Sequence, residues 1–430
     1  MTKYKLGDLC RIASSKRIFE SEYVDQGIPF IRGQEISDGS ILDPKASFEC
    51  YISQDRYEEI KEKYGKPSKG DILITAVGTI GNLCYLDKDI DFYFKDGNVI
   101  WFSEIIPSCE GKFLFHFMKS SFFKAQLKYF MIGAVQKALT IDMLKKVEVP
   151  LPSLPEQKKI ASVLSALDDK IALNKKMNQK LEAMAKRLYD YWFVQYDFPD
   201  KNGHPYKTTG GPMTYNPTLK REIPAGWEVT RLGDLFKTNR GVSYSTPTLG
   251  TEGDGVPMIN LASFSPNESY NEKGIKYYKG EYTDEKVLKP FDFVMCNTQQ
   301  TAIDPQKDII GRSMLVPDIF DGDIVSSHHV NTIKLEKENL KFYLNRLFNT
   351  KFYHAYISKF ANGTNILGLI FSGVEDYMCE IPSDDLLEKF AKISLDIEKK
   401  KSKIIKENQK LTALRDKLLP LLMNGQVEIK

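Results

Sequence analysis

Polar side chains in glycine-bounded loops are the residues of this chain that could do chemistry. Their amide, guanidinium and hydroxyl groups offer paired donors and acceptors, which suit base-pair edges in the major groove of DNA. The same groups also satisfy backbone atoms in ordinary loops, so each residue has two interpretations. In the first half of the chain the candidates are Arg32, Gln34, Thr75, Thr79, Gln136 and Lys137. In the second half they are Asn260, Asn297, Gln299, Gln300, His328 and Asn365.

Sequence patterns that indicate catalysis are missing. There is no GxxxxGK[ST] phosphate loop, which argues against ATP use by this chain. There is no [DN]PP[YFW] methyltransferase motif, because Asn216 and Pro217 are followed by Thr218. His328 and His329 form the only histidine pair; nothing nearby completes a metal set, and we interpret them as a strand-edge or polar-cleft pair. A carboxylate-and-lysine nuclease site has no distinctive pattern and stays an alternative. We therefore predict no catalytic residue, no metal site and no cofactor bound by this chain.

Composition limits the class of protein. With 430 residues, 42% hydrophobic and 12% aromatic, the chain is long and apolar enough for two to four folded domains. It has no apolar run of a membrane span's length and no signal-peptide pattern at its start. Its six cysteines form no CxxC pair, which predicts reduced thiols in a cytoplasmic protein. Segments 156–187 and 386–417 carry net charges of +4 and +5, whereas the rest sums to −6. Nucleic-acid binding would therefore depend on local clefts or on a basic partner.

The elements that position the candidate loops are mixed. Short strands are predicted at 71–77, 98–102 and 146–151, since apolar runs there are bounded by Gly, Asp and Pro. Residues 112–130 are long and apolar enough for one buried helix, and 341–360 match them in position and character. The Gly- and Pro-rich stretch 196–225 predicts a long connection that is mobile or contacts a partner.

Two further segments have the residue pattern of a long helix that packs against another helix along one face. We call the line of residues on that face the seam. Apolar or small residues recur in steps of three and four. Ser153 and Pro155 provide a helix start before the first seam, and Asn424 with Gly425 a stop after the second. The first seam is Ile160, Leu164, Leu167, Ile171, Asn174, Asn178, Leu181, Ala185, Leu188 and Trp192. The second is Phe390, Ile393, Ile397, Ile404, Leu411, Leu414, Leu418 and Leu421.

The chain contains an internal repeat. The tetrapeptide NQKL occurs at 178–181 and again at 408–411, an offset of 230 residues, and its flanks keep that register. LGDL occurs at 6–9 and at 232–235, and GIPFI at 27–31 returns as GVPMI at 255–259. A repeat of this size predicts two copies of one unit, each a globular domain followed by a long helix.

These pieces together resemble the DNA-specificity subunit of type I restriction–modification systems, over essentially the whole chain. The most specific matches are PLPSLPEQKKIA at 150–161 and IPAGWE at 223–228. GIPFIRGQEI at 27–36, KGDILITAVGTIGN at 69–82 and GAVQKALTID at 133–142 are similar to pieces of the family's target-recognition domains. KPFDFVMCNTQQTA at 289–302 and NGTNILGLIF at 362–371 depart from them. That departure is expected if the two domains read different half-sites.

The resemblance and the repeat predict an α+β fold. Two similar mixed α/β recognition domains, 1–152 and 226–382, would be joined by spacer helices at 153–195 and 383–425, with a linker at 196–225. The helices would form an antiparallel coiled coil with a pseudo-two-fold axis. They would act as a ruler, which means that their length would fix the separation of the two recognition domains. The resemblance implies a non-catalytic subunit that binds double-stranded DNA, two methyltransferase subunits and restriction subunits. S-adenosylmethionine, ATP and Mg would belong to those partners. A stand-alone methylase or nuclease, and a protein-only coiled-coil scaffold, stay as alternatives.

Two surfaces of the long helices carry further hypotheses. Asn174 and Asn178 occupy seam positions, and Asn408 is the repeat-mate of Asn178. In an antiparallel pair, Asn178 and Asn408 would meet near the axis and fix the register; the alternative is that these asparagines are exposed. The lysines of the second helix form either a solvated face or a surface for DNA or an acidic subunit. They are Lys399, Lys400, Lys401, Lys403 and Lys406.

Overall fold

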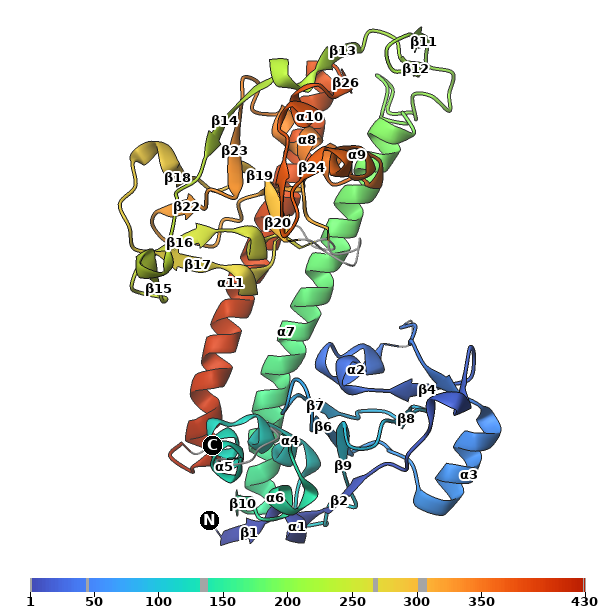
Figure 1. Ribbon diagram of the computed structural model, residues 1–430, viewed down its shortest axis with the longest axis vertical. Coiled ribbons are helices and arrows are strands. Elements are labelled where there is room, and N and C mark those ends of the chain that lie inside the picture. The colour runs from blue at the N-terminus through green and yellow to red at the C-terminus, as the bar shows by residue number, and fades with distance from the viewer. Residues whose placement is uncertain are drawn as a thin grey trace. The chain divides into compact units, whose positions relative to one another are not determined.

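Two long helices run through a structure made of two compact units. The computed structural model describes residues 2–43, 46–131, 138–265, 270–300, 308–427 and 429. Unit 1 comprises Met1–Ile171 and Lys410–Lys430, and unit 2 comprises Ala172–Gln409. The helices α7 (Leu154–Tyr189) and α11 (Asp384–Met423) each contribute one segment to either unit (Figure 1). The predicted α+β class and both predicted long helices are confirmed.

The described part of unit 1 contains three small sheets and six short α-helices. A four-stranded sheet has the order β2-β9-β6-β7, a second has the order β3-β5-β4-β8, and β1 pairs with β10. The strands are β1 Thr2–Lys5, β2 Arg11–Ser14, β3 Tyr23–Val24, β4 Ile28–Ile31, β5 Tyr51–Ile52, β6 Ile72–Thr75, β7 Leu83–Tyr85, β8 Tyr93–Phe94, β9 Val99–Ser103 and β10 Glu148–Leu151. The helices are α1 Leu6–Leu9, α2 Gly33–Ser37, α3 Gln54–Tyr64, α4 Gly111–Lys119, α5 Ser121–Phe130 and α6 Ile141–Lys145. The three strands predicted from the sequence correspond to β6, β9 and β10.

Unit 2 repeats this plan. Its four-stranded sheet has the order β14-β23-β19-β21, its second sheet β15-β17-β16-β22-β18, and β13 pairs with β26. It adds the ribbon β20-β25-β24 and the hairpin β11-β12. The strands are β11 Met213–Asn216, β12 Arg221–Pro224, β13 Glu228–Arg231, β14 Phe236–Arg240, β15 Leu249–Gly250, β16 Val256–Ile259, β17 Lys276–Tyr278, β18 Val287–Leu288, β19 Phe293–Cys296, β20 Thr298–Gln300, β21 Ser313–Leu315, β22 Ile324–Ser326, β23 Val330–Leu335, β24 Ala361–Asn362, β25 Ile366–Leu369 and β26 Met378–Ile381. The short helices are α8 Leu340–Phe348, α9 Lys351–Ile357 and α10 Ser372–Glu375.

The single helix predicted for 112–130 is wrong, because the chain breaks it at Ser120. Ser120 has an extended backbone, and its hydroxyl accepts a hydrogen bond from the Phe123 amide at 3.2 Å. A serine that caps in this way starts a new helix rather than continuing the old one. In unit 2, Thr350 caps α9 in the same way by accepting from the Tyr353 amide at 3.1 Å.

The connection 196–225 is a folded part of unit 2 and not a mobile loop; its predicted contact with a partner stays a prediction. It contains the hairpin β11-β12, and Tyr196, Phe198 and Ile223 are buried in the unit 2 core. The Phe198 ring stacks on Tyr206 at 4.5 Å and on Trp227 at 5.6 Å between centroids. Its aromatic residues therefore anchor a segment whose Gly and Pro content suggested a free loop.

Each unit buries parts of both long helices in its own core. In unit 1, Leu164 of α7 and Leu422 of α11 pack in one cluster with Phe113 and Phe117 of α4. In unit 2, Trp192 and Phe390 pack with Tyr343 of α8. The start of α7 follows the predicted pattern, since the Ser153 amide donates to the Glu156 carboxylate at 3.0 Å.

The helices are antiparallel within each unit. In unit 1, Arg415 lies 2.9 Å from Asp168, and in unit 2, Lys401 binds Glu182 at 2.6 Å. The residue numbers of both pairs add to 583. A constant sum means that one helix runs up as the other runs down, so the two helices are antiparallel. The expected Asn178–Asn408 contact is wrong by one helical turn. Asn174, and not Asn178, donates its side-chain amide to Asn408 Oδ1, at 3.0 Å.

Candidate nucleic-acid interface

Three loops of unit 1 that are far apart in the sequence meet at Ala76. The Ala76 amide donates to the Asn98 carbonyl at 2.7 Å, and the Leu139 amide donates to the Ala76 carbonyl at 2.9 Å. These bonds join the loop after β6, the loop before β9 and the segment before α6. We call this convergence the loop junction. The loop after β6, which it holds, carries the candidate Thr79 and directly follows the candidate Thr75.

The β6–β7 loop is held from inside by Thr75. This side chain is completely buried; its hydroxyl donates to the Thr79 carbonyl and accepts from the Asn82 amide at 3.0 Å. Gly78 and Gly81 have φ values of 75° and 92°, which favour glycine. Thr75 is therefore corrected from a surface reader to a support of the loop. Thr79 is exposed at the loop tip and keeps its candidate role.

Helix α2 is fastened to this loop. The Asn82 side chain donates to the Ser37 hydroxyl at 2.7 Å, which places α2 beside the loop tip. Gln34 of α2 is exposed, and its amide donates to Asp38 at 3.2 Å. Arg32 is half-buried and binds Glu49 at 2.7 Å; this hydrogen bond raises the pKa of the guanidinium. Gln136 and Lys137 lie outside the described residues.

Unit 2 has the same loop junction, centred on Asn297. The Asn297 amide donates to the His329 carbonyl at 3.0 Å, and the Leu369 amide donates to the Asn297 carbonyl at 2.8 Å. Asn297 follows β19 and His329 precedes β23, as Ala76 follows β6 and Asn98 precedes β9. The backbone pattern is therefore repeated, although the side chains around it differ.

Three candidates in unit 2 are corrected from surface readers to internal supports, because they are buried and hydrogen-bonded within the protein. Asn260 accepts from the Ala262 amide at 3.0 Å and donates to the Gly274 carbonyl at 2.7 Å. Asn297 donates to the Asn331 side chain at 2.7 Å. Gln299 accepts from the amides of Ile309 and Ile310 at 2.7 and 3.0 Å. Sequence alone gives the same residue types for both roles.

The ribbon β20-β25 presents the remaining candidates of unit 2. Gln300 pairs through its backbone with Ile366, and Asn365 is the residue that precedes this pair. Asn365 is exposed, and the Ile366 side chain is 57% exposed. Strand β25 also pairs with β24 on its other side, so the exposed Asn365 directly precedes the central strand of a three-stranded sheet and keeps its candidate role. Only the backbone of Gln300 lies within the described part of the chain.

Residues around His328 were missed by sequence reasoning. The rings of His328 and His329 lie 3.8 Å apart, and that of Tyr244 lies 5.6 Å from His328. The Arg240 guanidinium donates to the His328 carbonyl at 3.2 Å. Arg240 and Tyr244 belong to a segment with no motif, so only folding reveals their place. Among the described residues, no group of three or more His, Cys, Asp or Glu is arranged to hold a metal ion.

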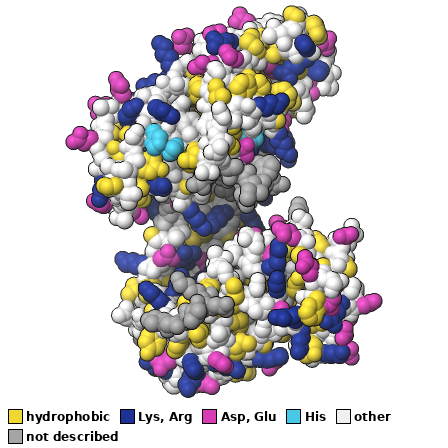
Figure 2. All heavy atoms as spheres, in the orientation of Figure 1, with side chains coloured by type: hydrophobic (Ala, Val, Ile, Leu, Met, Phe, Trp, Pro, Cys, Tyr) yellow, Lys and Arg dark blue, Asp and Glu magenta, His cyan; other side chains and the backbone are white. Residues whose placement is uncertain are grey.

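The lysines of α11 do not share one environment. Lys399, Lys400 and Lys403 are exposed, whereas Lys406 lies 3.6 Å from Asp318. Lys401 is buried and binds Glu182 and Glu398. The predicted lysine face is therefore smaller than expected. Figure 2 shows Lys and Arg side chains interspersed with Asp and Glu over the viewed face of each unit.

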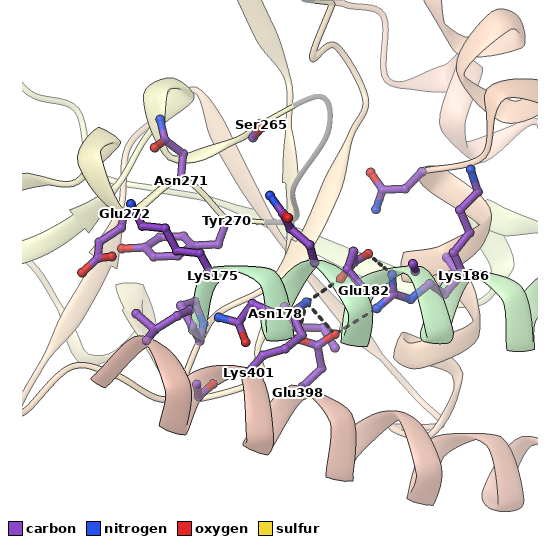
Figure 3. A pocket seen from close by; sticks show the side chains of 18 of the residues that line it. Lys175, Asn178, Glu182, Lys186, Ser265, Tyr270, Asn271, Glu272, Glu398 and Lys401 are labelled. Carbon is purple, nitrogen blue, oxygen red and sulfur yellow. Dashed lines mark hydrogen bonds and ion pairs between the residues drawn. The ribbon is translucent and has the colours of Figure 1, made fainter. Parts of the chain in front are cut away.

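Lys401 belongs to a buried charge cluster, which we call the charge tetrad: Glu182, Arg346, Glu398 and Lys401. Arg346 of α8 binds Glu182, and it binds Glu398 at 2.9 Å. The tetrad lies at a cavity of about 650 Å³ between α7, α11 and α8, all within unit 2 (Figure 3). Burial opposes ionisation of Glu182, but the charges of Arg346 and Lys401 outweigh it and lower its pKa to about 2. The tetrad fixes α8 on both long helices.

The comparisons with known proteins agree with one another. The family model of the type I restriction modification DNA specificity domain matches residues 1–183. The MjaIX specificity subunit of Methanocaldococcus jannaschii is 27% identical over 417 residues, covering 95% of this chain and 89% of that protein. The HindI specificity subunit of Haemophilus influenzae is 24% identical over 488 aligned residues, covering 99% of each chain.

A solved structure shares the fold. The S subunit of a type I restriction–modification system from M. genitalium matches with a TM-score of 0.56 at 15% identity, covering 98% of this chain and 95% of that one. None of the helices among the described residues has the length and apolar content that a membrane span requires. The matched domain, the full-length relatives and the shared fold agree: residues 1–183 match the type I restriction modification DNA specificity domain, and the whole chain is similar to the specificity subunits of type I restriction–modification systems.

Proposed function

We propose that this subunit reads a bipartite, asymmetric DNA site, with one half-site for each unit. The observation that carries the proposal is the repeated loop junction. Ala76 and Asn297 make the same two backbone hydrogen bonds, yet the side chains beside them differ. A conserved backbone with different polar side chains is what two readers of different sequences need, because base edges are distinguished by donor and acceptor pattern.

The long helices have a separate part in this proposal. They act as a ruler that sets the distance between half-sites, and they scaffold two methyltransferase subunits and restriction subunits. S-adenosylmethionine, ATP and Mg then belong to those partners. Support comes from the length of the helices, 36 and 40 residues, and from their buried polar contacts, which oppose slippage. The exposed lysines Lys399, Lys400 and Lys403 suit a phosphate backbone or an acidic partner surface.

A domain exchange tests the proposal. Residues 226–381 are replaced by the matching domain of another type I specificity subunit, and the methylated motif is determined by sequencing DNA from cells that co-express the methyltransferase subunits. We expect one half of the motif to change while the other half stays. Exchange of residues 1–150 is the matched control and should change the other half.

Two outcomes would contradict the proposal. If both halves of the motif changed together after either exchange, the units would not be separate readers. If complexes that contain the exchanged chain assembled normally but retained no DNA sequence selectively, the chain would be a protein-only scaffold.

A further inference from the structure

The backbone of His329 is held rigidly at the loop junction of unit 2. Its carbonyl accepts from the Asn297 amide at 3.0 Å. The preceding residue, His328, donates its amide to the Val242 carbonyl at 2.8 Å and accepts from Arg240 at 3.2 Å. Residues on two segments, 240–242 and Asn297, therefore fix this dipeptide, so the His329 ring leaves the backbone in a defined direction.

One nitrogen of the His329 ring is used by the protein and the other is not. Nδ1 lies 2.7 Å from the Thr298 hydroxyl. Nε2 has no hydrogen bond to the described residues, and it is not among the buried atoms that lack a partner. A ring with Nδ1 held by the Thr298 hydroxyl and Nε2 accessible offers a single donor or acceptor to a ligand, and because a hydroxyl can donate or accept, the contact fits either tautomer.

The charged groups that face this ring are all positive. Burial lowers the pKa of His329, and His328, Arg240 and Lys276 lower it further. Arg240 comes from β14 and Lys276 from β17, where its ammonium lies 5.2 Å from the centre of the Tyr244 ring. Among the described residues, neither Arg240 nor Lys276 has a carboxylate partner. A neutral ring inside a positive rim suits a base edge flanked by phosphates.

The corresponding position of unit 1 carries a different side chain. Asn98 has the same backbone role at its loop junction, accepting from Ala76 at 2.7 Å. Asn pairs well with adenine, whereas histidine offers one nitrogen to an acceptor or donor. At this position the two units have the same backbone hydrogen bond but different side chains. Such a position suits the recognition of different bases by the two units.

We propose that His329, oriented by Thr298, reads a base in the half-site of unit 2, with Arg240 and Lys276 placed for the adjacent phosphates. This inference rests on the proposed function and adds a residue to it. Because a bound phosphate reduces the positive field on the ring, DNA binding should favour protonation of His329. The affinity for this half-site should therefore rise as the pH falls.

The experiment uses the full chain in complex with its methyltransferase subunits and a DNA library in which every position of the bipartite motif is varied. His329→Asn is compared with the wild type for DNA retention at pH 6 and pH 8. We expect base preference to fall at least about five-fold at one position of one half-site. We also expect the gain in affinity at pH 6 to be lost. Thr298→Val should weaken the same preference, and Thr298→Ser should keep it. His204→Asn, an exposed histidine outside the loop junction, is the matched control and should change nothing.

The outcomes separate the inference from the function on which it rests. If His329→Asn folds with an unchanged unfolding midpoint and keeps the wild-type preference at every position, the inference is overturned while bipartite reading stands. If it lowers the affinity for all library members equally, His329 supports the fold and does not read a base. If the wild-type complex itself shows no preference at the second half-site, the proposed function fails first.

Discussion

Arg346 binds Glu398 at 2.9 Å, and the two residues that lie 230 positions earlier, His116 and Asp168, are 3.9 Å apart. The repeat thus preserves a basic residue on a short helix beside a carboxylate on a long helix. In unit 1 the charge of Asp168 is met by Lys119 at 2.8 Å and by Arg415 at 2.9 Å. Each unit is therefore fastened to the long helices by a polar cluster at corresponding places, although the partners of the carboxylates differ.

The charge tetrad predicts a large effect of removing one charge. Glu182→Gln leaves Arg346 and Lys401 with Glu398 as their remaining tetrad carboxylate, and both cations are buried. Breaking a buried ion pair on one side costs about 3–5 kcal/mol. We expect thermal unfolding of unit 2 to shift to lower temperature, with hydrogen exchange locating the loss in α8. Lys389→Ala breaks only the exposed pair with Asp385 and should cost less than about 1 kcal/mol. Equal effects of the two variants would contradict this account.

The same cluster predicts a pH dependence with a defined sign. The pKa of Glu182 is about 2 in the folded chain, against an ordinary value of 4.5. A lowered carboxylate pKa stabilises the fold above the ordinary value and loses this contribution as the pH falls toward 2. The stability difference between wild type and Glu182→Gln should therefore be full at pH 7 and shrink below about pH 4.5. Urea unfolding at a series of pH values measures it. A difference that stays constant down to pH 3 would contradict the prediction.

His116 predicts a second pH dependence, in unit 1. Here the group is neutral in the folded chain and becomes charged on unfolding, whereas Glu182 is charged in the folded chain. Burial, followed by the charge of Lys119, lowers the pKa of His116 to about 4, against the opposing influence of Asp168. The folded chain thus holds a neutral ring, whereas the unfolded chain takes up a proton near the ordinary value of 6.5. Stability is then complete above pH 6.5 and declines as the pH falls toward 4, by at most about 1.4 kcal/mol per pH unit.

His116→Gln should remove that decline, since glutamine can still reach the Ser165 hydroxyl, which lies 3.1 Å from His116 Nε2. Hydrogen exchange of unit 1 between pH 4 and pH 7 reports the change. His204→Gln, which leaves the surroundings of His116 intact, is the control. A variant that keeps the wild-type slope in this range would show that another group causes it.

The sequence predicted helices and strands whose apolar pattern is local. It did not predict which side chains are buried by segments that are distant in the sequence. The seams located both long helices, yet Ile393 and Leu414 are 40% and 46% exposed, while Leu419 and Leu422 are buried. A seam read in steps of three and four drifts around a helix of 3.6 residues per turn, so its ends turn away from the partner.

Some of the candidate base-reading residues are buried, and the sequence could not predict this for a different reason. Thr75 and Gln299 have side chains that could hydrogen-bond to a base. In the folded chain these side chains instead accept hydrogen bonds from backbone amides of nearby loops. Nothing in the local sequence separates the two uses. Thr79, Asn365 and, on helix α2, Gln34 are exposed, and only the folded structure separates them from the buried candidates.

The three central asparagines predict opposite effects of similar substitutions. Asn174 is 1% exposed and donates to Asn408 and to Glu407, so Asn174→Leu removes the donor to the buried Asn408 side chain and should cost about 1–3 kcal/mol. The Asn178 amide oxygen is buried and has no hydrogen-bond partner among the described residues. Asn178→Leu should therefore stabilise the chain by up to about 1 kcal/mol. Chemical denaturation of both variants tests the pair, and destabilisation by Asn178→Leu would contradict the register assigned here.

The ruler role predicts the result of lengthening the helices together. Four residues inserted after Asn174 in α7 add about 6 Å along the axis and move Glu182 one turn away from Lys401. This single insertion should abolish assembly, because the tetrad and the asparagine contact fall out of register. A second insertion of four residues before Asn408 in α11 restores the antiparallel register while keeping the added length. DNA rises about 3.4 Å per base pair. The doubly extended subunit should therefore recognise the same two half-sites with one or two more base pairs between them, as methylation sequencing would show. An unchanged spacer with full methylation would mean that the helices do not set the distance.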